Sequence, residues 1–302
     1  MSKCKICKSS TRLWKKVADD RFKNISKNKY SKKKFNISIC KNCKFAFVDP
    51  TPSEKFCEDF YKSLRGGLQT NLNLYDLVKG ENKSFNHIRE NKKIIKNLIQ
   101  IHKIKNKHFL DIGCGYGFLS FFAKKYKFKT VMTDIAAHER KISKQLCDQK
   151  VLKFDFNKKV FKKKFGVLAL VNILEHVPNF NNFISRSHLA LEKNGILILA
   201  VPNFSSLITK IFRDKDPYVC PPEHLNYFSK NNIELLMLKN NFTICKTYYW
   251  TYLPLQFWQN RSNKLIGYLL YFLSFPFFSI IDFFNLGWMQ VVYAKKNDIK
   301  KA

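Results

Sequence analysis

The feature that most constrains the fold is a glycine-rich turn between a short apolar run and an apolar helical pattern. Residues 109–119 read FLDIGCGYGFL, with glycines at positions 113, 115 and 117. Glycines at such a turn let the backbone bend tightly and approach a ligand closely, and the following helix presents its N-terminus there. The turn therefore predicts a strand, a ligand-binding loop and a helix in immediate succession.

The same alternation of short apolar runs and longer helical patterns continues toward residue 202. The runs are HFLDI, TVMTD, VLKFD, FGVLALV and GILILAV. Right-handed crossovers turn such a series into an open parallel sheet that binds ligands beyond the carboxyl ends of its strands. Two further β-rich runs, at 242–249 and 288–294, are expected to add edge strands. We therefore predict an α/β fold with a Rossmann-like, open, mostly parallel sheet of seven strands.

The turn and the acids beside it resemble the first motif of the class I S-adenosylmethionine-dependent methyltransferases, which is an acidic residue followed by G-x-G-x-G. The resemblance covers about residues 107–250. It implies S-adenosylmethionine as the cofactor, with Asp134 on the ribose hydroxyls and Asp155 on the adenine amino group. The cofactor-binding residues implied by this likeness and by the fourth motif are Asp111, Gly113, Cys114, Gly115, Gly117, Asp134, Asp155 and Asn172.

The run FGVLALVNILEHVPN resembles the fourth motif of that family, in which the strand end faces both the methionine part of the cofactor and the substrate. Its candidate residues are Asn172, Glu175 and His176. Two roles stay open for the last two residues: direct catalysis, or capping and orienting the following helix. The chain departs from the family at Gly166, where relatives usually carry an aspartate, and this departure bears on stability more than on activity.

Two Cys-x-x-Cys pairs near the N-terminus predict a metal site. Cys4, Cys7, Cys40 and Cys43 offer four thiolates, which is a ligand set of structural zinc. Redox chemistry, the alternative, needs one low-potential pair rather than two. The 32 residues between the pairs exceed the spacer of about 15–20 residues in compact ribbons. The lysine-rich stretch 15–34 is therefore expected to form an extended loop.

Two segments also resemble sugar C-methyltransferases and related enzymes of surface-polysaccharide loci. CKNCKFAFVDPTPSEKFCEDFY is similar to their zinc ribbon and connecting helix, with a helix expected to start after Ser53. PPEHLNYFS is similar to their general-base segment. The likeness implies a base dyad of Glu223 and His224 with Tyr227 beside the substrate, and His176 is the next candidate. It does not extend to the large C-terminal domain of those enzymes, so their substrates are not carried over.

Residues 265–284 contain the uncharged stretch LIGYLLYFLSFPFFSII between two strands that are expected in one sheet. A spanning helix needs about 20 apolar residues, and Pro276 interrupts this shorter stretch. Both ends must also return to the same side of a membrane. We expect a kinked pair of short helices that dips into one leaflet or packs on a partner, with a buried helical subdomain as the alternative.

The net charge of +33 raises the question of a nucleic-acid partner. Only eight of the 55 basic residues are arginines, although Arg is the residue that grips phosphates and bases bidentately. The fourth motif also lacks the Asn/Asp-Pro-Pro-aromatic pattern of base N-methyltransferases. We therefore expect no nucleic-acid partner, whereas acidic membranes and anionic substrates stay compatible with the charge.

These observations predict a zinc-ribbon module at 1–52, connecting helices at 53–106 and a methyltransferase domain at 107–302, with a hydrophobic insertion at 250–287. The start MSKCKICKSS has no apolar stretch, which favours the cytoplasm. Contact with the inner face of the membrane is a further expectation. The expected acceptor is a sugar, a glycan or a lipid-linked saccharide of cell-surface polysaccharide biosynthesis. The alternatives are an RNA methyltransferase that uses the basic zinc module and a cofactor-binding scaffold without catalysis.

Overall fold

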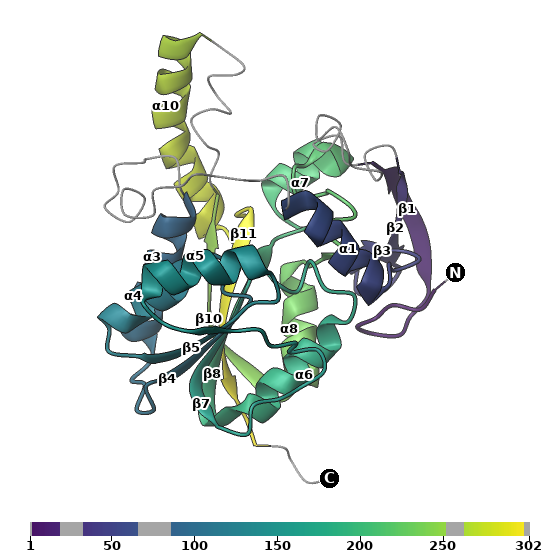
Figure 1. Cartoon of the computed structure of the whole chain (residues 1–302). Coiled ribbons are helices and arrows are strands. Elements are labelled where there is room, and N and C mark those ends of the chain that lie inside the picture. The colour runs from purple at the N-terminus through teal and green to yellow at the C-terminus, as the bar shows by residue number, and fades with distance from the viewer. Residues whose placement is uncertain (1, 19–32, 66–85, 252–262, 299–302) are drawn as a thin grey trace.

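The computed structural model describes residues 2–18, 33–65, 86–251 and 263–298 (Figure 1). Its main sheet has seven strands in the order β10-β11-β8-β7-β4-β5-β6. The strands are β4 (His108–Ile112), β5 (Lys129–Thr133), β6 (Val151–Leu152), β7 (Phe165–Val171), β8 (Leu191–Pro202), β10 (Phe242–Trp250) and β11 (Met289–Lys296). β4 to β8 are parallel, whereas β11 runs antiparallel to both β8 and β10. The expected mostly parallel seven-stranded sheet is confirmed.

Helices cover both faces of this sheet (Figure 1). They are α3 (Asn86–Ile101), α4 (Phe118–Lys125), α5 (Ala137–Cys147), α6 (Phe180–Ala190) and α8 (Lys230–Lys239). α3 and α4 pack on a cluster that includes Phe109, whereas α6 and α8 pack on a cluster that includes Leu110. Neighbouring residues of a strand point to opposite faces, so one continuous apolar strand contributes side chains to the core on both faces of the sheet.

A second sheet joins the N-terminal module to the larger body. Its strands are β1 (Thr11–Val17), β2 (Phe35–Cys40), β3 (Ala46–Val48) and β9 (Asn226–Tyr227), in the order β1-β2-β3-β9. β3 pairs antiparallel with β9, so the two parts share backbone hydrogen bonds. The expectation of a loop from residue 15 is wrong at its start, because Lys15 and Lys16 pair with β2 inside β1. Residues 19–32 of that stretch lie outside the described residues.

The helix expected after Ser53 is α1 (Glu54–Arg65). The Ser53 hydroxyl accepts the Phe56 N–H at 3.2 Å, which confirms the predicted N-cap. The sequence predicts the end of this helix near Gly66 and Gly67, and these two residues lie outside the described residues. The module boundaries at residues 52 and 106 stay a prediction.

The hydrophobic insertion contains one continuous helix, α10 (Lys264–Phe283), which projects from the body (Figure 1). The expected pair of short helices is therefore wrong, because Pro276 lies inside the helix without ending it. Pro276 removes a single backbone donor, and the turns on both sides keep their own bonds. A buried subdomain is also wrong, since most large side chains of α10 are exposed. By length and composition, Leu265–Phe283 could cross a membrane.

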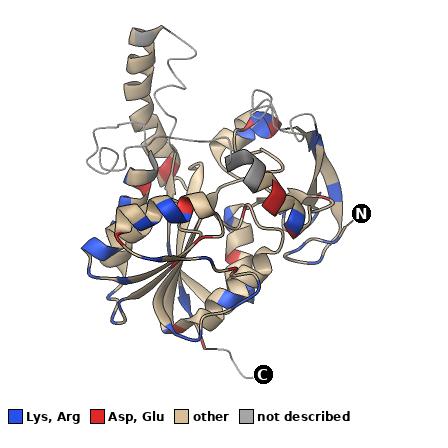
Figure 2. Cartoon of the chain, viewed as in Figure 1, with Lys and Arg blue, Asp and Glu red and all other residues tan. Residues whose placement is uncertain are grey.

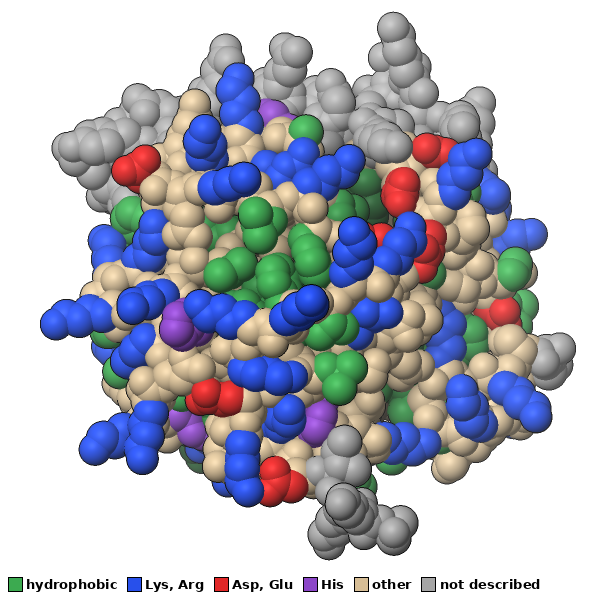
Figure 3. Space-filling model, turned by 60° about the horizontal axis from the view of Figure 1, so that its bottom comes forward, with side chains coloured by type: hydrophobic (Ala, Val, Ile, Leu, Met, Phe, Trp, Pro, Cys, Tyr) green, Lys and Arg blue, Asp and Glu red, His purple; other side chains and the backbone are tan. Residues whose placement is uncertain are grey.

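The basic residues do not gather into a single stripe on the face shown in Figure 3. Lys and Arg side chains are scattered across that whole face, with apolar and acidic side chains between them. A nucleic-acid interface concentrates its positive charge along the path of the phosphates. This face of the molecule therefore has the character of a solvated lysine-rich surface.

Candidate functional site

The glycine loop between β4 and α4 is closed on one side and open on the other. Gly113 has φ +64°, and a Cβ atom there would lie 2.2 Å from Cδ1 of Ile173. Gly117 has φ +86° and is the N-cap of α4. By contrast, no atom lies within 4 Å of a Cβ built on Gly115. A ligand can therefore approach the backbone closely on the side of Gly115.

Asp134, at the carboxyl end of β5, lies against this loop. Its Oδ2 accepts the N–H of Gly115 at 3.0 Å, and its Oδ1 accepts the N–H of Ala136 at 2.8 Å. The loop and the carboxylate are thereby fixed relative to each other. This is the neighbourhood in which a ribose acceptor is expected, next to the second glycine of the loop.

Asp111 is buried beneath the loop and braces it. The Ser120 hydroxyl of α4 donates to its Oδ2 at 2.7 Å. Burial raises the pKa of Asp111 to about 6, and the nearby Asp134 carboxylate adds to the rise. Asp111 therefore accepts a hydrogen bond from a helix side chain, and this bond ties the end of β4 to α4 beneath the loop.

The other expected cofactor residues surround the loop at different depths. Asn172 follows β7 with φ +54°, and its buried Oδ1 has no hydrogen-bond partner among the described residues. Cys114 donates its N–H to the Thr133 carbonyl at 2.9 Å. Asp155 caps the turn after β6 through the Asn157 N–H and pairs with Lys158 at 3.4 Å. An unpartnered acceptor on Asn172 is therefore available to a donor on a bound ligand.

Two histidines from distant parts of the chain meet at this edge of the sheet. The ring centroids of His176 and His224 lie 4.7 Å apart, with an interplanar angle of 73°. Nδ1 of His224 lies 2.8 Å from the Tyr218 carbonyl, and Nδ1 of His176 lies 2.9 Å from the Glu223 carbonyl. A carbonyl only accepts, so Nδ1 of His224 is a hydrogen-bond donor, which leaves Nε2 as the nitrogen of that ring that can accept a proton.

Glu175 completes this cluster as a buried carboxyl group. Its Oε1 lies 3.9 Å from Nε2 of His176, and only 2% of the residue is exposed. Burial raises the pKa of Glu175 to about 8, with a further rise from the Glu223 carboxylate. The group is therefore mostly protonated at neutral pH. The donor atoms of Glu175, His176 and His224 also lie within 4.8 Å of one another, a spacing that can hold a metal ion.

The expected base dyad of Glu223 and His224 stays a prediction. The structure shows that Nδ1 of His224 donates to the Tyr218 carbonyl, and that the backbone carbonyl of Glu223 lies against Nδ1 of His176. Tyr227 is buried, and its hydroxyl donates to the His224 carbonyl at 2.9 Å. It therefore supports the backbone of the His224 loop, and its expected position beside the substrate stays a prediction.

Sequence reasoning missed two residues of this cluster. Tyr61 of α1 places its hydroxyl 2.6 Å from Nδ1 of His176. Tyr218 holds His224 through its carbonyl, and its ring stacks over that histidine at 5.8 Å. A backbone carbonyl leaves no signal in a sequence, and Tyr61 lies 115 positions before His176. For Tyr61 the sequence predicted the helix that carries it, but not the position of that helix beside His176.

The four cysteines form a second candidate site. Sγ of Cys4 lies 3.6 Å from Sγ of Cys43, and Sγ of Cys7 lies 3.4 Å from Sγ of Cys40. Disulfide sulfurs lie about 2.05 Å apart, whereas four Zn–S bonds of about 2.3 Å give a tetrahedron with edges near 3.8 Å. The sulfur spacing therefore fits a tetrathiolate zinc site. The second Cys-x-x-Cys pair contacts the larger domain through Asn232 of α8, which donates to the Cys43 carbonyl at 2.6 Å.

Comparison with known proteins agrees with this geometry. Residues 85–247, more than half of the chain, match the family model described as a methyltransferase domain. The chain belongs to this family. The matched residues include the glycine loop, Asp134 and both histidines, whereas the four cysteines and α10 lie outside the match.

Curated relatives cover a similar region. The chain is 32% identical over 192 residues to a ubiquinone biosynthesis O-methyltransferase of Pelagibacter ubique, covering 53% of this chain and 78% of the relative. A protein of the same name from Histophilus somni is 24% identical over 189 residues, covering 54% and 76%. A solved S-adenosylmethionine-dependent methyltransferase of Archaeoglobus fulgidus shares the fold, with TM-score 0.51, 16% identity and coverage of 74% and 99%. The protein is an S-adenosylmethionine-dependent methyltransferase.

Proposed function

We propose that this methyltransferase methylates a sugar, a glycan or a lipid-linked saccharide of cell-surface polysaccharide biosynthesis, in the cytoplasm at the inner face of the membrane. The observation that carries the proposal is the contact of the His176 and His224 rings, in which the fixed Tyr218 carbonyl accepts a hydrogen bond from Nδ1 of His224. A saccharide hydroxyl is a weak nucleophile, so its methylation gains from a base placed beside it. We assign this role to Nε2 of His224, with His176 beside it.

The residues around the glycine loop fit the cofactor. S-adenosylmethionine, when bound, supplies an electrophilic methyl group on a sulfonium. The loop from Gly113 to Gly117 would hold the methionine part, Asp134 the ribose hydroxyls and Asp155 the adenine amino group. The unpartnered Oδ1 of Asn172 would accept from the ammonium. The carboxylates of Asp111 and Asp134 favour a cationic ligand here, although the chain as a whole is strongly basic.

His224 would take the proton that the acceptor hydroxyl loses. The Tyr218 carbonyl fixes the tautomer of the ring before the transfer and stabilises the imidazolium after it. The thioether leaving group is neutral and needs no acid, so the chain supplies position and one base. Glu175, protonated at neutral pH, adds no negative charge that would compete for the same proton.

We further propose that Cys4, Cys7, Cys40 and Cys43 bind a structural zinc ion. Its effect on the reaction would be indirect. The module that it closes contributes β3, which pairs with β9 at Asn226 and Tyr227, directly after His224. A closed zinc site would therefore hold the His224 loop from its far side.

A second candidate acceptor follows from the relatives. The curated proteins of similar sequence are named for O-methylation in ubiquinone biosynthesis. An acceptor of that kind is also a hydroxyl compound, and the same histidine would serve it. The sugar and ubiquinone candidates are separated by their acceptors rather than by their cofactor site.

The test uses nucleotide sugars, lipid-linked sugars and ubiquinone precursors as acceptors, with methylation read by mass spectrometry. We expect His224→Ala to lose at least about a hundredfold in kcat, as removal of a general base does, while the Kd for S-adenosylmethionine stays unchanged. His188→Ala is the matched control, because His188 is also buried on a backbone carbonyl but lies at the C-terminal end of α6, on Asn297. Wild-type rates for His224→Ala on a confirmed acceptor would contradict the assignment.

A further inference from the structure

α10 exposes large apolar side chains around most of its circumference. Leu265, Leu269 and Phe272 are 83%, 58% and 62% exposed. Figure 2 shows no Lys, Arg, Asp or Glu along the described projecting turns of α10. Soluble proteins rarely leave apolar areas of this size uncovered. The helix therefore needs an apolar surrounding that the described residues of this chain do not provide.

The pattern of covered positions indicates what that surrounding is. A narrow stripe with Gly267, Ser274, Phe278 and Ile281 is buried. On an amphipathic surface helix the side opposite such a stripe is polar, but here it is apolar as well. A second copy of the chain would cover one more stripe and leave the remainder in water. We infer that α10 inserts into the acyl layer of a lipid bilayer, with anionic headgroups at its root, the C-terminal turns from Phe278 onward.

The connections of α10 restrict it to one leaflet. β10 ends at Trp250 opposite Met289, the first residue of β11, so the insertion leaves and re-enters the body at one place. The N–H and hydroxyl of Thr251 bond to Asp282 there, which ties the last turn of α10 to the same point. A full crossing would require residues 252–262 to cross back. Eleven residues reach about 17 Å as a helix, which is well short of the hydrocarbon core of about 30 Å that a full crossing spans.

The length of the free part agrees with this placement. The root, from Phe278 onward, packs on Ile208 and Trp288. The turns from 264 to 277 extend for about 21 Å, whereas one leaflet of the hydrocarbon core is about 15 Å thick. The helix therefore fits one leaflet when it is inclined to the membrane plane.

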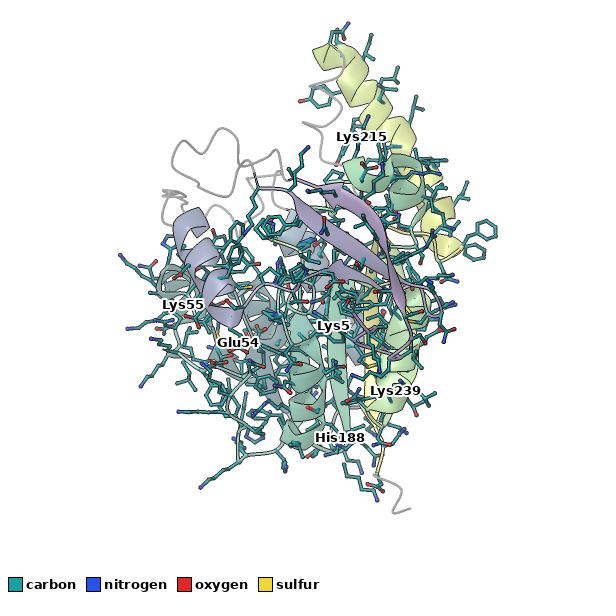
Figure 4. All side chains as sticks on the ribbon, turned by 90° about the vertical axis from the view of Figure 1, so that its right-hand side faces the viewer. Lys5, Glu54, Lys55, His188, Lys215 and Lys239 are labelled. Carbon is teal, nitrogen blue, oxygen red and sulfur yellow. The ribbon has the colours of Figure 1, made fainter. Side chains whose placement is uncertain are left out.

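Three basic residues, Lys210, Arg213 and Lys215, belong to a segment that packs beside the root. α7 (Leu207–Phe212) and the short helix η2 (Arg213–Lys215) join it where the Leu207 N–H donates to the Leu286 carbonyl at 3.0 Å. Figure 4 shows Lys215 on this segment, at the same end of the body from which α10 projects. This segment carries Lys210, Arg213 and Lys215 next to the exposed apolar residues Ile211 and Phe212. Cations flanked by exposed apolar side chains suit an anionic headgroup layer.

The root of α10 is also built into the acceptor side of the active site. Nε1 of Trp288 donates to Oδ1 of Asp216 at 3.1 Å, and the same oxygen accepts the Tyr218 N–H at 2.8 Å. The Tyr218 carbonyl in turn holds His224. α10 leaves the sheet where β8 ends, because Met289 pairs with Pro202. The catalytic edge therefore faces the bilayer, and we assign the acceptor to an amphiphile whose tail stays in the membrane, an assignment that rests on the proposed function.

Vesicle sedimentation of the purified full chain tests the insertion without any acceptor. We expect binding to phosphatidylcholine vesicles and tighter binding when phosphatidylglycerol is included. Leu269→Asp with Phe272→Asp should abolish both, whereas Leu238→Asp, an exposed leucine of α8, should not. Replacing Lys210, Arg213 and Lys215 by alanine should remove on the order of tenfold or more of the preference for phosphatidylglycerol. A wild-type chain that stays in the supernatant, or that forms a lipid-independent dimer through α10 in light scattering, would overturn the inference.

Labelling in intact cells tests the one-leaflet placement. Asn263→Cys puts a thiol at the start of α10, and the exposed Cys245 of β10 serves as an internal control. With an impermeant maleimide and peptide mass spectrometry, we expect neither position to be labelled before the cells are permeabilised. Labelling of position 263 alone from outside would show a full crossing and refute the placement.

Turnover distinguishes failure of the membrane inference from failure of the proposed function. Leu269→Asp with Phe272→Asp should lose at least about tenfold in rate on an acceptor embedded in vesicles and keep the wild-type rate on the same headgroup without its tail. Equal rates on the embedded acceptor would contradict the membrane-side acceptor. If the wild type binds vesicles but methylates no saccharide or ubiquinone precursor, the proposed function fails and the insertion stands.

Discussion

Replacing Glu175 by glutamine should change how stability depends on pH, because this carboxyl group is buried in the folded chain. Burial raises its pKa from 4.5 to about 8. Above pH 4.5 the unfolded chain releases the proton while the folded chain keeps it. Stability from this group is therefore full below pH 4.5 and decreases until pH 8. Glutamine has nearly the same shape and does not titrate, so this part of the pH dependence should vanish.

The magnitude follows from the two pKa values. Each pH unit between them removes about 1.4 kcal/mol from the free energy of unfolding. From pH 6 to pH 9 the wild type should therefore lose about 2.7 kcal/mol through Glu175 alone. Lys5, whose pKa burial lowers to about 8, has the opposite sign, since its burial favours the neutral form that appears as pH rises. The pH dependence of the wild-type free energy of unfolding is therefore not diagnostic by itself. The difference in this pH dependence between the wild type and Glu175→Gln is diagnostic.

Urea denaturation at pH 6 and pH 9, followed by tryptophan fluorescence, measures this difference. Glu58→Gln is the matched control, because Glu58 is exposed on α1 and its replacement should leave the wild-type pH profile unchanged. The free energies of unfolding of wild type and Glu175→Gln should diverge by about 2–3 kcal/mol in favour of the variant at pH 9 relative to pH 6. Parallel profiles would refute the reasoning and show that Glu175 is already ionised at pH 6.

Three shorter predictions concern the other sites. The purified chain should carry one zinc ion by elemental analysis, and replacing all four cysteines of the Cys4 cluster by serine should remove it; unchanged zinc content would place the site elsewhere. Asp134→Ala should weaken S-adenosylmethionine binding by about 1.5–3 kcal/mol in calorimetry, and exposed Asp59→Ala should not; an unaltered Kd would exclude Asp134 as the ribose acceptor. Gly166→Ala should destabilise the fold by at least about 1–3 kcal/mol, because its Cβ would lie 2.0 Å from the Asn106 carbonyl; a variant with wild-type Tm would show that this segment can move aside.

Gly166 shows what a sequence motif can and cannot give. Comparison with the methyltransferase pattern marked position 166 as a departure, since an aspartate is usual there. The structure supplies the cause, because β7 passes so close to the Asn106 carbonyl that only glycine fits. Motif reasoning identifies an unusual residue, but the close approach of two segments 60 positions apart is a tertiary fact.

The main sheet and the glycine loop were predictable because their signals are local. Apolar runs of strand length, helical spacing between them and a glycine turn after the first run suffice to place β4, β5, β7 and β8. The prediction for Pro276 was wrong for a related reason. Proline tends to end helices. This rule does not take into account that the hydrogen bonds of the neighbouring turns can maintain a helix in which one backbone N–H donor is missing.

The candidate site was predictable in its residue types but not in its contacts. The motifs identified His176 and His224 separately, and the fold brings their rings together. The partners of their Nδ1 atoms include the carbonyls of Glu223 and Tyr218. Every residue has a carbonyl, so residue identity carries no information about which one will be used.

The pairing of β3 with β9 also has a consequence for how the chain is made. Phe47 pairs with Asn226, so the cysteine-bearing module leaves the ribosome some 180 residues before the free edge of β3 has its partner strand. Until then β3 presents an unpaired edge, the kind of edge that recruits strands from other chains. Contacts of such long sequence separation also form slowly. Early metal capture by the N-terminal cysteines would keep this nascent module compact during the delay, and zinc-starved cells should accumulate aggregated chains rather than inactive soluble enzyme.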